Sequence, residues 1–374
     1  MNGLLLVSNW GSKMALNWIE ISKEALLNNI KVIKEKAKGK KILAVVKSNA
    51  YGHGLIEVSR ILQDSVHAFV VADLEEGLEL KNQLKDAKII LSLPPLTEKE
   101  IKETAESGFS IFAGNLEYIS DLAKMKLGKT LSVHVEINTG MNRSGLSPEG
   151  LAKALEIIQN APHLSLEGIF SHYATLPENI NFAKTQAERF RKVIKSTNLP
   201  SDTLIHMENS SGILKLLLDI TNSVRPGISI YGLISSNSDN KLQPILSLKS
   251  TVIDIIRIHK GEGVSYDHLF KAPRDMWVAT IPLGYGNGYM WNLKGKADVL
   301  FKGQRLPILG KVCMNHIIFD ATKVVGYIKV GDVVTLIGKD GGEEITVAEL
   351  AEKSKTINYE IVTKLSPKLK RVVV

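Results

Sequence analysis

Residues 42–54 read Ile-Leu-Ala-Val-Val-Lys-Ser-Asn-Ala-Tyr-Gly-His-Gly, and this stretch opens the pattern that decides the fold. The five consecutive apolar residues 42–46 predict a strand that is buried on both faces, as strands of parallel sheets are. Before it, Ser22 is a suitable N-cap for a helix whose apolar side chains recur at helical spacing until Gly39. This strand is therefore expected to begin a series of alternating helices and strands.

The alternation continues along the next 180 or so residues of the chain, at the strand and helix lengths usual for α/β units. Counting 42–46, the sequence predicts eight strands, each followed by a helix or by a loop that leads to one. Eight such units in roughly 250 residues predict a (β/α)8 barrel, and an open doubly wound sheet is the structural alternative because strands 4 and 8 are weak. The other strands are expected at 68–72, 88–93, 109–113, 132–137, 165–170, 203–206 and 223–224, and the helices include 74–84, 98–107, 116–126, 148–159, 182–196 and 212–218.

A different pattern begins after about residue 233. The polar segment 235–241, Ser-Ser-Asn-Ser-Asp-Asn-Lys, is the best domain boundary. Short β-rich runs cut by Gly and Asp turns follow it and predict a mostly antiparallel domain with one short helix at 346–353. The β-rich runs are 248–258, 277–282, 297–301, 312–319 and 332–337. We expect an N-terminal extension over residues 1–16, the barrel over 17–240 and a mostly β domain over 241–374.

Composition excludes several classes of protein. The 374 residues are 44% hydrophobic and 23% charged, as in ordinary globular proteins. The net charge of +8 is scattered over helices, which does not indicate a nucleic-acid groove. A single cysteine, Cys313, fits a reducing cytoplasm, and no apolar run approaches the roughly 20 residues of a membrane span. The expectation is a cytoplasmic protein without nucleic-acid or membrane partners.

Lys47 closes the first barrel strand, where a charged side chain is unusual because burial of charge is costly. One interpretation is a desolvated amine with a lowered pKa, which suits Schiff-base chemistry. The other is a lysine whose ammonium extends into solvent from the strand end. Lys47 alone does not decide between them.

Other reactive side chains fall on the same predicted rim, since the active sites of barrels lie at the carboxyl ends of the strands. Together they bring a histidine, two arginines and a helix N-terminus near Lys47, and the loops after strands 7 and 8 commonly hold a phosphate. The implied ligand is a phosphorylated carbonyl compound. Cys313 and the histidines lack metal-binding spacing, so no metal is expected. The rim residues are Arg143, His172, Asn209, Ser210, Ser211, Arg225, Pro226 and Gly227.

With these residues in place, the chain from about Asn17 onward resembles the fold-type III pyridoxal-phosphate enzymes, and most closely the bacterial alanine racemases. Residues 44–54 resemble the cofactor-lysine motif of that family, which implies that Lys47 holds pyridoxal 5′-phosphate. The resemblance also implies that Arg225, in Val-Arg-Pro-Gly-Ile, faces the pyridine nitrogen. The other cofactor contacts that it implies are Tyr51, His172, Asn209, Ser210, Gly227, Ile228 and Tyr359.

The resemblance assigns further roles outside the cofactor site. Tyr266, in Val-Ser-Tyr, matches the second catalytic base, and Met314, in Val-Cys-Met, matches a substrate-carboxylate contact beside Arg143. Tyr285 and Tyr289 resemble the tyrosines of an access corridor. The family builds each active site across a head-to-tail homodimer, which implies that Tyr266 and Met314 act on the partner subunit.

The implied reaction is the interconversion of L-alanine and D-alanine by a two-base mechanism, with D-alanine supplied for peptidoglycan. Three positions depart from the family pattern: Glu136 replaces a lysine that is often carbamylated, Asn315 replaces a common aspartate, and Glu208 replaces a small residue. Glu136 is expected to support Arg143. The alternatives are a racemase of broader specificity for Lys, Arg or Ser, a non-catalytic cofactor-binding barrel, which lacks the second domain, and a decarboxylase on the same barrel.

Overall fold

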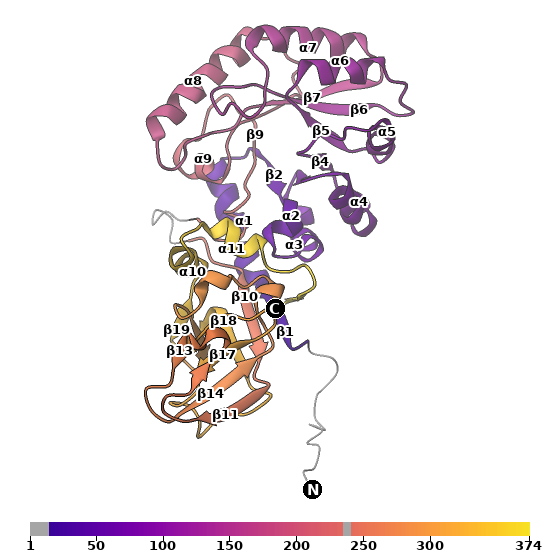
Figure 1. Ribbon diagram of the computed structural model, residues 1–374. Coiled ribbons are helices and arrows are strands. Elements are labelled where there is room, and N and C mark those ends of the chain that lie inside the picture. The colour runs from indigo at the N-terminus through magenta and orange to yellow at the C-terminus, as the bar shows by residue number, and fades with distance from the viewer. Residues whose placement is uncertain (1–14, 235–240) are drawn as a thin grey trace. The chain divides into compact units, whose positions relative to one another are not determined.

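The computed structural model describes residues 15–234 and 241–374, and they form two compact units (Figure 1). The first, which we call the barrel unit, is Ser22–Ile245. The second, which we call the β unit, combines strand β1 (Asn17–Ile21) with Leu246–Val374.

The barrel unit contains a closed barrel of eight parallel strands in chain order, β2 to β9. The last strand pairs with the first, through Lys41 opposite Ser223 and Ile42 opposite Val224. This closure confirms the predicted (β/α)8 barrel and excludes the open doubly wound sheet. The strands are β2 (Lys41–Val45), β3 (Ala68–Val71), β4 (Ile89–Leu91), β5 (Ser110–Ala113), β6 (Leu131–Glu136), β7 (Leu164–Phe170), β8 (Leu204–His206) and β9 (Ser223–Val224).

Helices surround these strands (Figure 1), and the longer ones, such as α1 and α8, bury an apolar stripe. The first begins at Ser22, whose side chain accepts a hydrogen bond from the backbone N–H of Ala25, as predicted for an N-cap. An apolar cluster that includes Leu43, Val70 and Leu204 fills part of the interior. The helices are α1 (Lys23–Ala37), α2 (Lys47–Tyr51), α3 (Leu55–Leu62), α4 (Leu74–Gln83), α5 (Glu98–Glu106), α6 (Leu116–Lys124), α7 (Pro148–Asn160), α8 (Ile180–Ser196) and α9 (Ser210–Lys215).

The β unit is built on a sheet whose strands follow the order β11-β14-β17-β16-β15-β18-β10-β1-β20, with β19 beside β18. Every pair along this path except β1–β20 is antiparallel, which confirms the mostly β domain. The strands are β10 (Leu246–Thr251), β11 (Asp254–Ile258), β12 (Gly263–Val264), β13 (Phe270–Lys271), β14 (Met276–Ile281), β15 (Asp298–Phe301), β16 (Gln304–Leu309), β17 (Ile317–Asp320), β18 (Val333–Asp340), β19 (Glu343–Ile345) and β20 (Lys370–Val373). Its helices are α10 (Val347–Ser354) and α11 (Asn358–Thr363), with short 3-10 turns η2 (Tyr266–His268), η3 (Tyr285–Asn287) and η4 (Trp291–Leu293).

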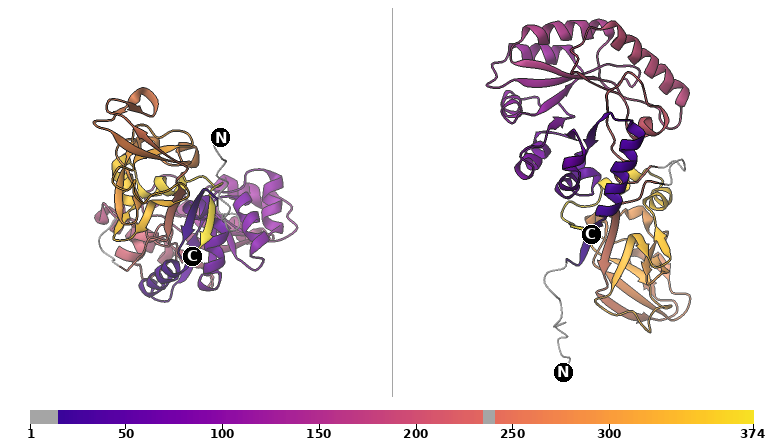
Figure 2. Two further views of the ribbon diagram at one scale, coloured as in Figure 1. Left: turned by 90° about the horizontal axis from the view of Figure 1, so that it is seen from below. Right: turned by 180° about the vertical axis from the view of Figure 1, so that it is seen from behind.

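Strand β1 corrects the predicted boundary of the barrel. We assigned residues 17–21 to the barrel, but β1 pairs with β10 on one side and with β20 on the other. The indigo β1 and the yellow β20 lie side by side in Figure 2 (left). A closed barrel has no free edge to which a further strand could add, whereas the sheet of the β unit offers one. The predicted extension 1–16 and boundary loop 235–241 fall almost entirely outside the described residues. Within the described chain, no helix is long and apolar enough to cross a membrane.

Candidate active site

Lys47 lies directly after β2, at the carboxyl end of the barrel, where it begins α2. Burial lowers the pKa of its amine, the positive charges of Arg143 and Arg225 lower it further, and the carboxylate of Glu76 opposes them. A lowered pKa favours the first interpretation of this residue, a desolvated amine suited to Schiff-base chemistry.

The backbone after Lys47 forms a left-handed turn. Residues 48–51 all have positive φ, between 51° and 55°, and none of them is glycine. Each such residue costs roughly 1–2 kcal/mol relative to a right-handed conformation, so surrounding contacts must hold the turn. The turn fixes the direction in which the chain leaves the reactive lysine.

Glu76 on α4 is one of the groups that hold this turn. Its carboxylate accepts hydrogen bonds from the backbone N–H of Asn49, at 2.7 Å, and from that of Ala72, at 2.8 Å. The side chain of Asn49 accepts another from the N–H of Leu55, at 2.8 Å. Glu76 is a site residue that the sequence did not indicate, because its partner lies 27 positions away.

Arg225 follows β9 and is 5% exposed. Its guanidinium donates to the carbonyl oxygen of Ser171 at 2.7 Å and to that of His206 at 3.1 Å, and it also contacts Nδ1 of His206 and of His172. Burial lowers its pKa to about 10, although Glu136 and Glu208 act in the opposite direction. The guanidinium is therefore charged at neutral pH and can only donate hydrogen bonds.

His172, after β7, is the neighbour of Arg225 on the same rim. The guanidinium lies 3.4 Å from its Nδ1, which must accept, so the ring proton sits on Nε2. Burial, followed by the charges of Arg225, Arg143 and Lys47, lowers the pKa of His172 to about 3. His172 is thus a neutral imidazole with one N–H to donate.

A glycine cradle lies after β9, where we predicted phosphate contacts. A Cβ atom at Gly227 would lie 2.7 Å from the hydroxyl of Tyr51, so a larger residue there would displace the Tyr51 side chain. The hydroxyl of Ser210 accepts from the backbone N–H groups of Gly227, at 2.9 Å, and Ser229, at 3.1 Å. The predicted Asn209 caps α9, and Ile228 is buried next to the cradle.

The loop that carries Arg143 is anchored to β6. Glu136, at the end of β6, is 6% exposed and accepts a hydrogen bond from the hydroxyl of Ser144. Arg143 itself is exposed. Within the described parts of the chain, no hydrogen bond or ion pair joins Glu136 to Arg143, so Glu136 supports this loop through the neighbouring serine.

Gln186 on α8 is a second residue that the sequence did not indicate. Its fully buried amide donates to the carbonyl oxygen of His172 at 3.0 Å and accepts from the N–H of Ala174 at 2.9 Å. It therefore fixes the loop after β7 at the residues on either side of Tyr173. A polar side chain on the buried face of an otherwise apolar helix stripe is the signal that could have identified it.

In the β unit, three predicted side chains gather at adjoining loops. Tyr266 is 67% exposed, Met314 is 57% exposed and Tyr285 is 44% exposed. The backbone N–H of Tyr285 donates to the carbonyl oxygen of Cys313 at 3.0 Å, and the backbone N–H of Gly286 donates to the carbonyl oxygen of Met314 at 2.8 Å. An apolar and aromatic cluster this exposed is typical of a surface that another molecule covers.

The other two predicted tyrosines of the β unit differ in exposure. Tyr359, on α11, is 42% exposed. Tyr289 is 2% exposed, and its hydroxyl lies in the interior of the β unit. Only the first of them lies at a surface where it could reach a ligand.

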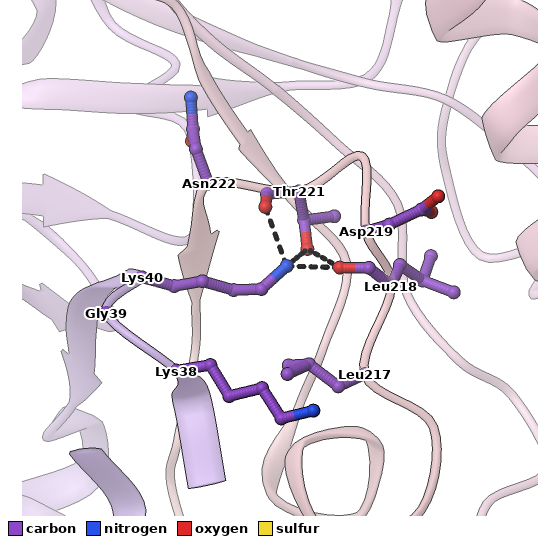
Figure 3. A pocket seen from close by; sticks show the side chains of 8 residues that line it. All are labelled: Lys38, Gly39, Lys40, Leu217, Leu218, Asp219, Thr221 and Asn222. Atoms are coloured by element: carbon purple, nitrogen blue, oxygen red, sulfur yellow. Dashed lines mark hydrogen bonds between the residues drawn. The ribbon is translucent and has the colours of Figure 1, made fainter. Parts of the chain in front are cut away.

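Lys40 marks the opposite end of the barrel, because it lies in the loop that precedes β2 (Figure 3). Burial lowers the pKa of this amine too. It donates to the carbonyl and hydroxyl oxygens of Thr221, both at 2.6 Å, and to the carbonyl of Leu218. Glu208 binds the same loop through the N–H of Leu218, at 2.7 Å, so this departure from the family pattern has a structural partner. Lys40 is held by the chain, which distinguishes it from Lys47.

Comparison with known proteins identifies both units. The family model described as "Alanine racemase, N-terminal domain" matches residues 21–235, and "Alanine racemase, C-terminal domain" matches 245–373. An alanine racemase of Clostridium novyi (strain NT) is 36% identical over 370 residues, covering 95% of this chain and 94% of the relative.

Solved structures give the same result. An alanine racemase from Bacillus anthracis with bound L-Ala-P has a TM-score of 0.89 at 32% identity, covering 97% of this chain and 96% of the other. A histidine racemase from Leuconostoc mesenteroides subsp. sake also has a TM-score of 0.89, at 30% identity, covering 98% of this chain and 100% of the other. The similarity thus extends over the whole length of these proteins.

Proposed function

The chain belongs to the alanine racemase family, and from this premise we propose that it interconverts L-alanine and D-alanine with pyridoxal 5′-phosphate bound at the carboxyl end of the barrel. The observation that carries the proposal is the pairing of a desolvated amine, Lys47, with a buried guanidinium, Arg225, on one rim. A non-catalytic cofactor-binding barrel is disfavoured because the chain carries both family domains.

The residues of the barrel fit this cofactor. Lys47 would hold it covalently, and the cradle at Gly227, beside Tyr51 and Ser210, would hold its phosphate. Arg225 would face the ring nitrogen. When bound, the cofactor supplies an electron sink that acidifies the α-hydrogen of the amino acid attached to it.

Arg225 has a direct consequence for this chemistry. Since the guanidinium only donates, it would hydrogen-bond the ring nitrogen of the cofactor only where that nitrogen carries no proton. A ring nitrogen without a proton withdraws electrons less strongly. Arg225 in this place would therefore limit side reactions such as transamination while leaving proton exchange at the α-carbon feasible.

Two bases serve the two faces of the substrate in this proposal. Lys47 moves a proton at one face, and Tyr266 of the partner subunit moves a proton at the other. A tyrosine has an ordinary pKa near 10, so its anion needs stabilisation. The Nε2–H of neutral His172 is suited to supply it, because Arg225 occupies the other ring nitrogen.

The substrate carboxylate is proposed to bind Arg143 of the same chain and Met314 of the partner subunit. The proposal requires a homodimer with shared active sites, and the exposure of Tyr266 and Met314 on the β unit supports it. Tyr359 is proposed as a further phosphate contact. The D-alanine formed would be available for peptidoglycan.

A second candidate is a racemase for other amino acids, which the likeness to a histidine racemase keeps open. The test is a comparison of kcat/KM for the L-isomers of alanine, serine, lysine, arginine and histidine. We expect alanine to exceed each of the others by at least about tenfold, a difference of roughly 1.4 kcal/mol in transition-state binding. A higher kcat/KM for any other amino acid would replace the proposed substrate.

A further inference from the structure

A chain of polar side chains runs from Arg225 through the interior of the barrel. Nη1 of Arg225 contacts Nδ1 of His206, on β8. Nε2 of His206 lies 2.9 Å from Nδ1 of His134, on β6, and Nε2 of His134 lies 3.5 Å from a carboxylate oxygen of Glu167, on β7. Both histidines are completely buried, so their ring nitrogens depend on each other for hydrogen bonds.

Arg225 determines which ring nitrogen of each histidine donates a hydrogen bond and which accepts one. A guanidinium only donates, so Nδ1 of His206 must accept and the ring proton of His206 must sit on Nε2. That proton is donated to Nδ1 of His134, which places the proton of His134 on Nε2, facing Glu167. Arg225, His206 and His134 thus each point an N–H toward the next group, and the last of them faces a carboxylate oxygen of Glu167 3.5 Å away.

The barrel is built around these rings. A Cβ atom at Gly168 would lie 2.1 Å from Nδ1 of His134, so glycine is the residue that leaves room for the ring. The pairing of β6 with β7 shifts register here, from Val133 opposite Leu166 to His134 opposite Gly168, which leaves Glu167 as the extra residue of a bulge. Bulges re-aim side chains and are typical of functional positions.

Aromatic rings enclose the polar side chains that run from Arg225 to His134. The ring of Phe170 stacks on His206 with centroids 5.2 Å apart, and the guanidinium of Arg225 lies 5.0 Å from the centroid of Phe170. Phe112 packs against His134 at 5.6 Å. These rings exclude water and strengthen the hydrogen bonds between the imidazoles.

Glu167 has the chemistry of a final acceptor. Burial alone would raise the pKa of Glu167, but the contact with His134, 3.5 Å away, the hydrogen bond from Ser110 and the charge of Lys88 together lower it below its usual range. The hydroxyl of Ser110, at the start of β5, donates to it. At neutral pH, Glu167 is therefore a carboxylate that can only accept.

We propose that Glu167 is a positioning residue. Its carboxylate accepts from the Nε2–H of His134 and thereby keeps Nδ1 of His206 as the acceptor that orients the guanidinium of Arg225. The effect on catalysis rests on the proposed function. Without an acceptor at position 167, the proton of His134 is free to move to Nδ1. His206 would then turn an N–H toward the guanidinium, and Arg225 would lose a partner.

The test compares Glu167→Met, which removes the acceptor at similar volume, with Glu167→Gln, which keeps an acceptor oxygen without the charge. Long-range proton–nitrogen NMR spectra of protein with 15N-labelled histidine report which ring nitrogen carries the proton. In the wild type we expect protonated Nε2 and bare Nδ1 at His134 and His206. We expect the same in Glu167→Gln and a mixture of tautomers in Glu167→Met.

Kinetics and cofactor absorbance give the second measurement, with protein loaded with pyridoxal 5′-phosphate. Glu167→Met should keep its cofactor and its KM for alanine while kcat falls by about tenfold, the scale of lost outer contacts at other sites. Glu167→Gln should stay within about threefold of wild type in kcat, since the chain of donors survives.

Two results would overturn the proposal. One is wild-type protein in which either histidine carries its proton on Nδ1, a measurement that needs no variant. The other is equal behaviour of Glu167→Met and Glu167→Gln in tautomers and kcat. If wild-type protein racemised no amino acid, the proposed function would fail, while the NMR measurement would still decide the role of Glu167 toward His206.

Discussion

Lys47 and Lys40 are lysines of one barrel whose amines both lose basicity through burial, yet their surroundings differ. The amine of Lys40 is satisfied by oxygens of Leu218 and Thr221, whereas that of Lys47 lies near two arginines. Lys47→Ala should abolish the visible absorbance of the bound cofactor and nearly all turnover, because its amine forms the covalent link. Lys40→Ala is the matched control and should keep both. Cofactor trapped by borohydride on another lysine of wild-type protein would refute the assignment.

Glu136 carries its carboxyl group at the position where the resemblance to the family implies a lysine that is often carbamylated. It is buried and bound to Ser144, beside Arg143. We expect activity that does not depend on bicarbonate, and Glu136→Gln should raise KM for alanine more than it lowers cofactor occupancy. A charge-assisted hydrogen bond is roughly twice as strong as a neutral one, so this loop should loosen when the charge is lost. Degassed enzyme that regains activity on addition of bicarbonate would show that a lysine is carbamylated instead.

Sequence reasoning at the level of residues succeeded where chemistry and chain position coincide. Lys47, His172 and Arg225 are charged or titratable groups at the ends of apolar strands, which is why they could be selected. Glu76, Gln186 and Glu167 could not, because each acts on a partner at least 12 positions away and is otherwise an ordinary surface-type residue. Their roles depend on the closure of the barrel.

At the scale of elements, the β6–β7 bulge makes a prediction about stability. Gly168→Ala should destabilise the protein by about 1–3 kcal/mol, because the added methyl collides with His134. Gly150, in the first turn of α7, is the matched control, since a Cβ there meets its nearest neighbour at 3.4 Å. Gly150→Ala should be neutral or stabilising by up to about 1 kcal/mol. Urea unfolding of both variants measures the difference, and equal stabilities would contradict the close packing around His134.

The barrel strands were predictable because strands of a parallel sheet are continuous apolar runs. The predicted strand 42–46 corresponds to β2 (Lys41–Val45), and 68–72 corresponds to β3 (Ala68–Val71). The β unit was harder. The predicted strand 248–258 is divided between β10 and β11, which pair with different strands, and the two residues between them, Val252 and Ile253, are apolar and give no turn signal.

The left-handed turn at residues 48–51 had no signal in the sequence. Positive φ usually requires glycine or asparagine, and three of the four residues here are Ser, Ala and Tyr. Contacts distant in sequence, above all the hydrogen bond from Asn49 to Glu76, offset the conformational free energy that these left-handed residues cost. Local propensity therefore could not predict the geometry next to the reactive lysine.

At the scale of the whole molecule, the proposed site is divided between two copies of the chain. Exposed Tyr266 and Met314 on the β unit have the character of an interface. Inactive Lys47→Ala and Tyr266→Phe proteins, mixed under conditions that exchange subunits, should regain activity, because one of the two sites in a hybrid dimer is then intact. The regain should approach a quarter of wild-type activity, since half of the dimers are hybrids at equal mixing and each has one working site of two. Lys47→Ala mixed with Lys47→Ala,Tyr266→Phe is the control and should stay inactive. Activity no higher than that of the separate variants would argue for sites built within a single chain.

The central claim is that this chain racemises alanine through a cofactor held by Lys47. The most direct measurement follows D-alanine, detected with D-amino-acid oxidase, as purified protein acts on L-alanine with pyridoxal 5′-phosphate present. The account predicts that D-alanine rises until the two enantiomers are equal, that the reverse reaction reaches the same mixture, and that Lys47→Ala gives neither. Cofactor-loaded wild-type protein that forms no D-alanine would contradict it.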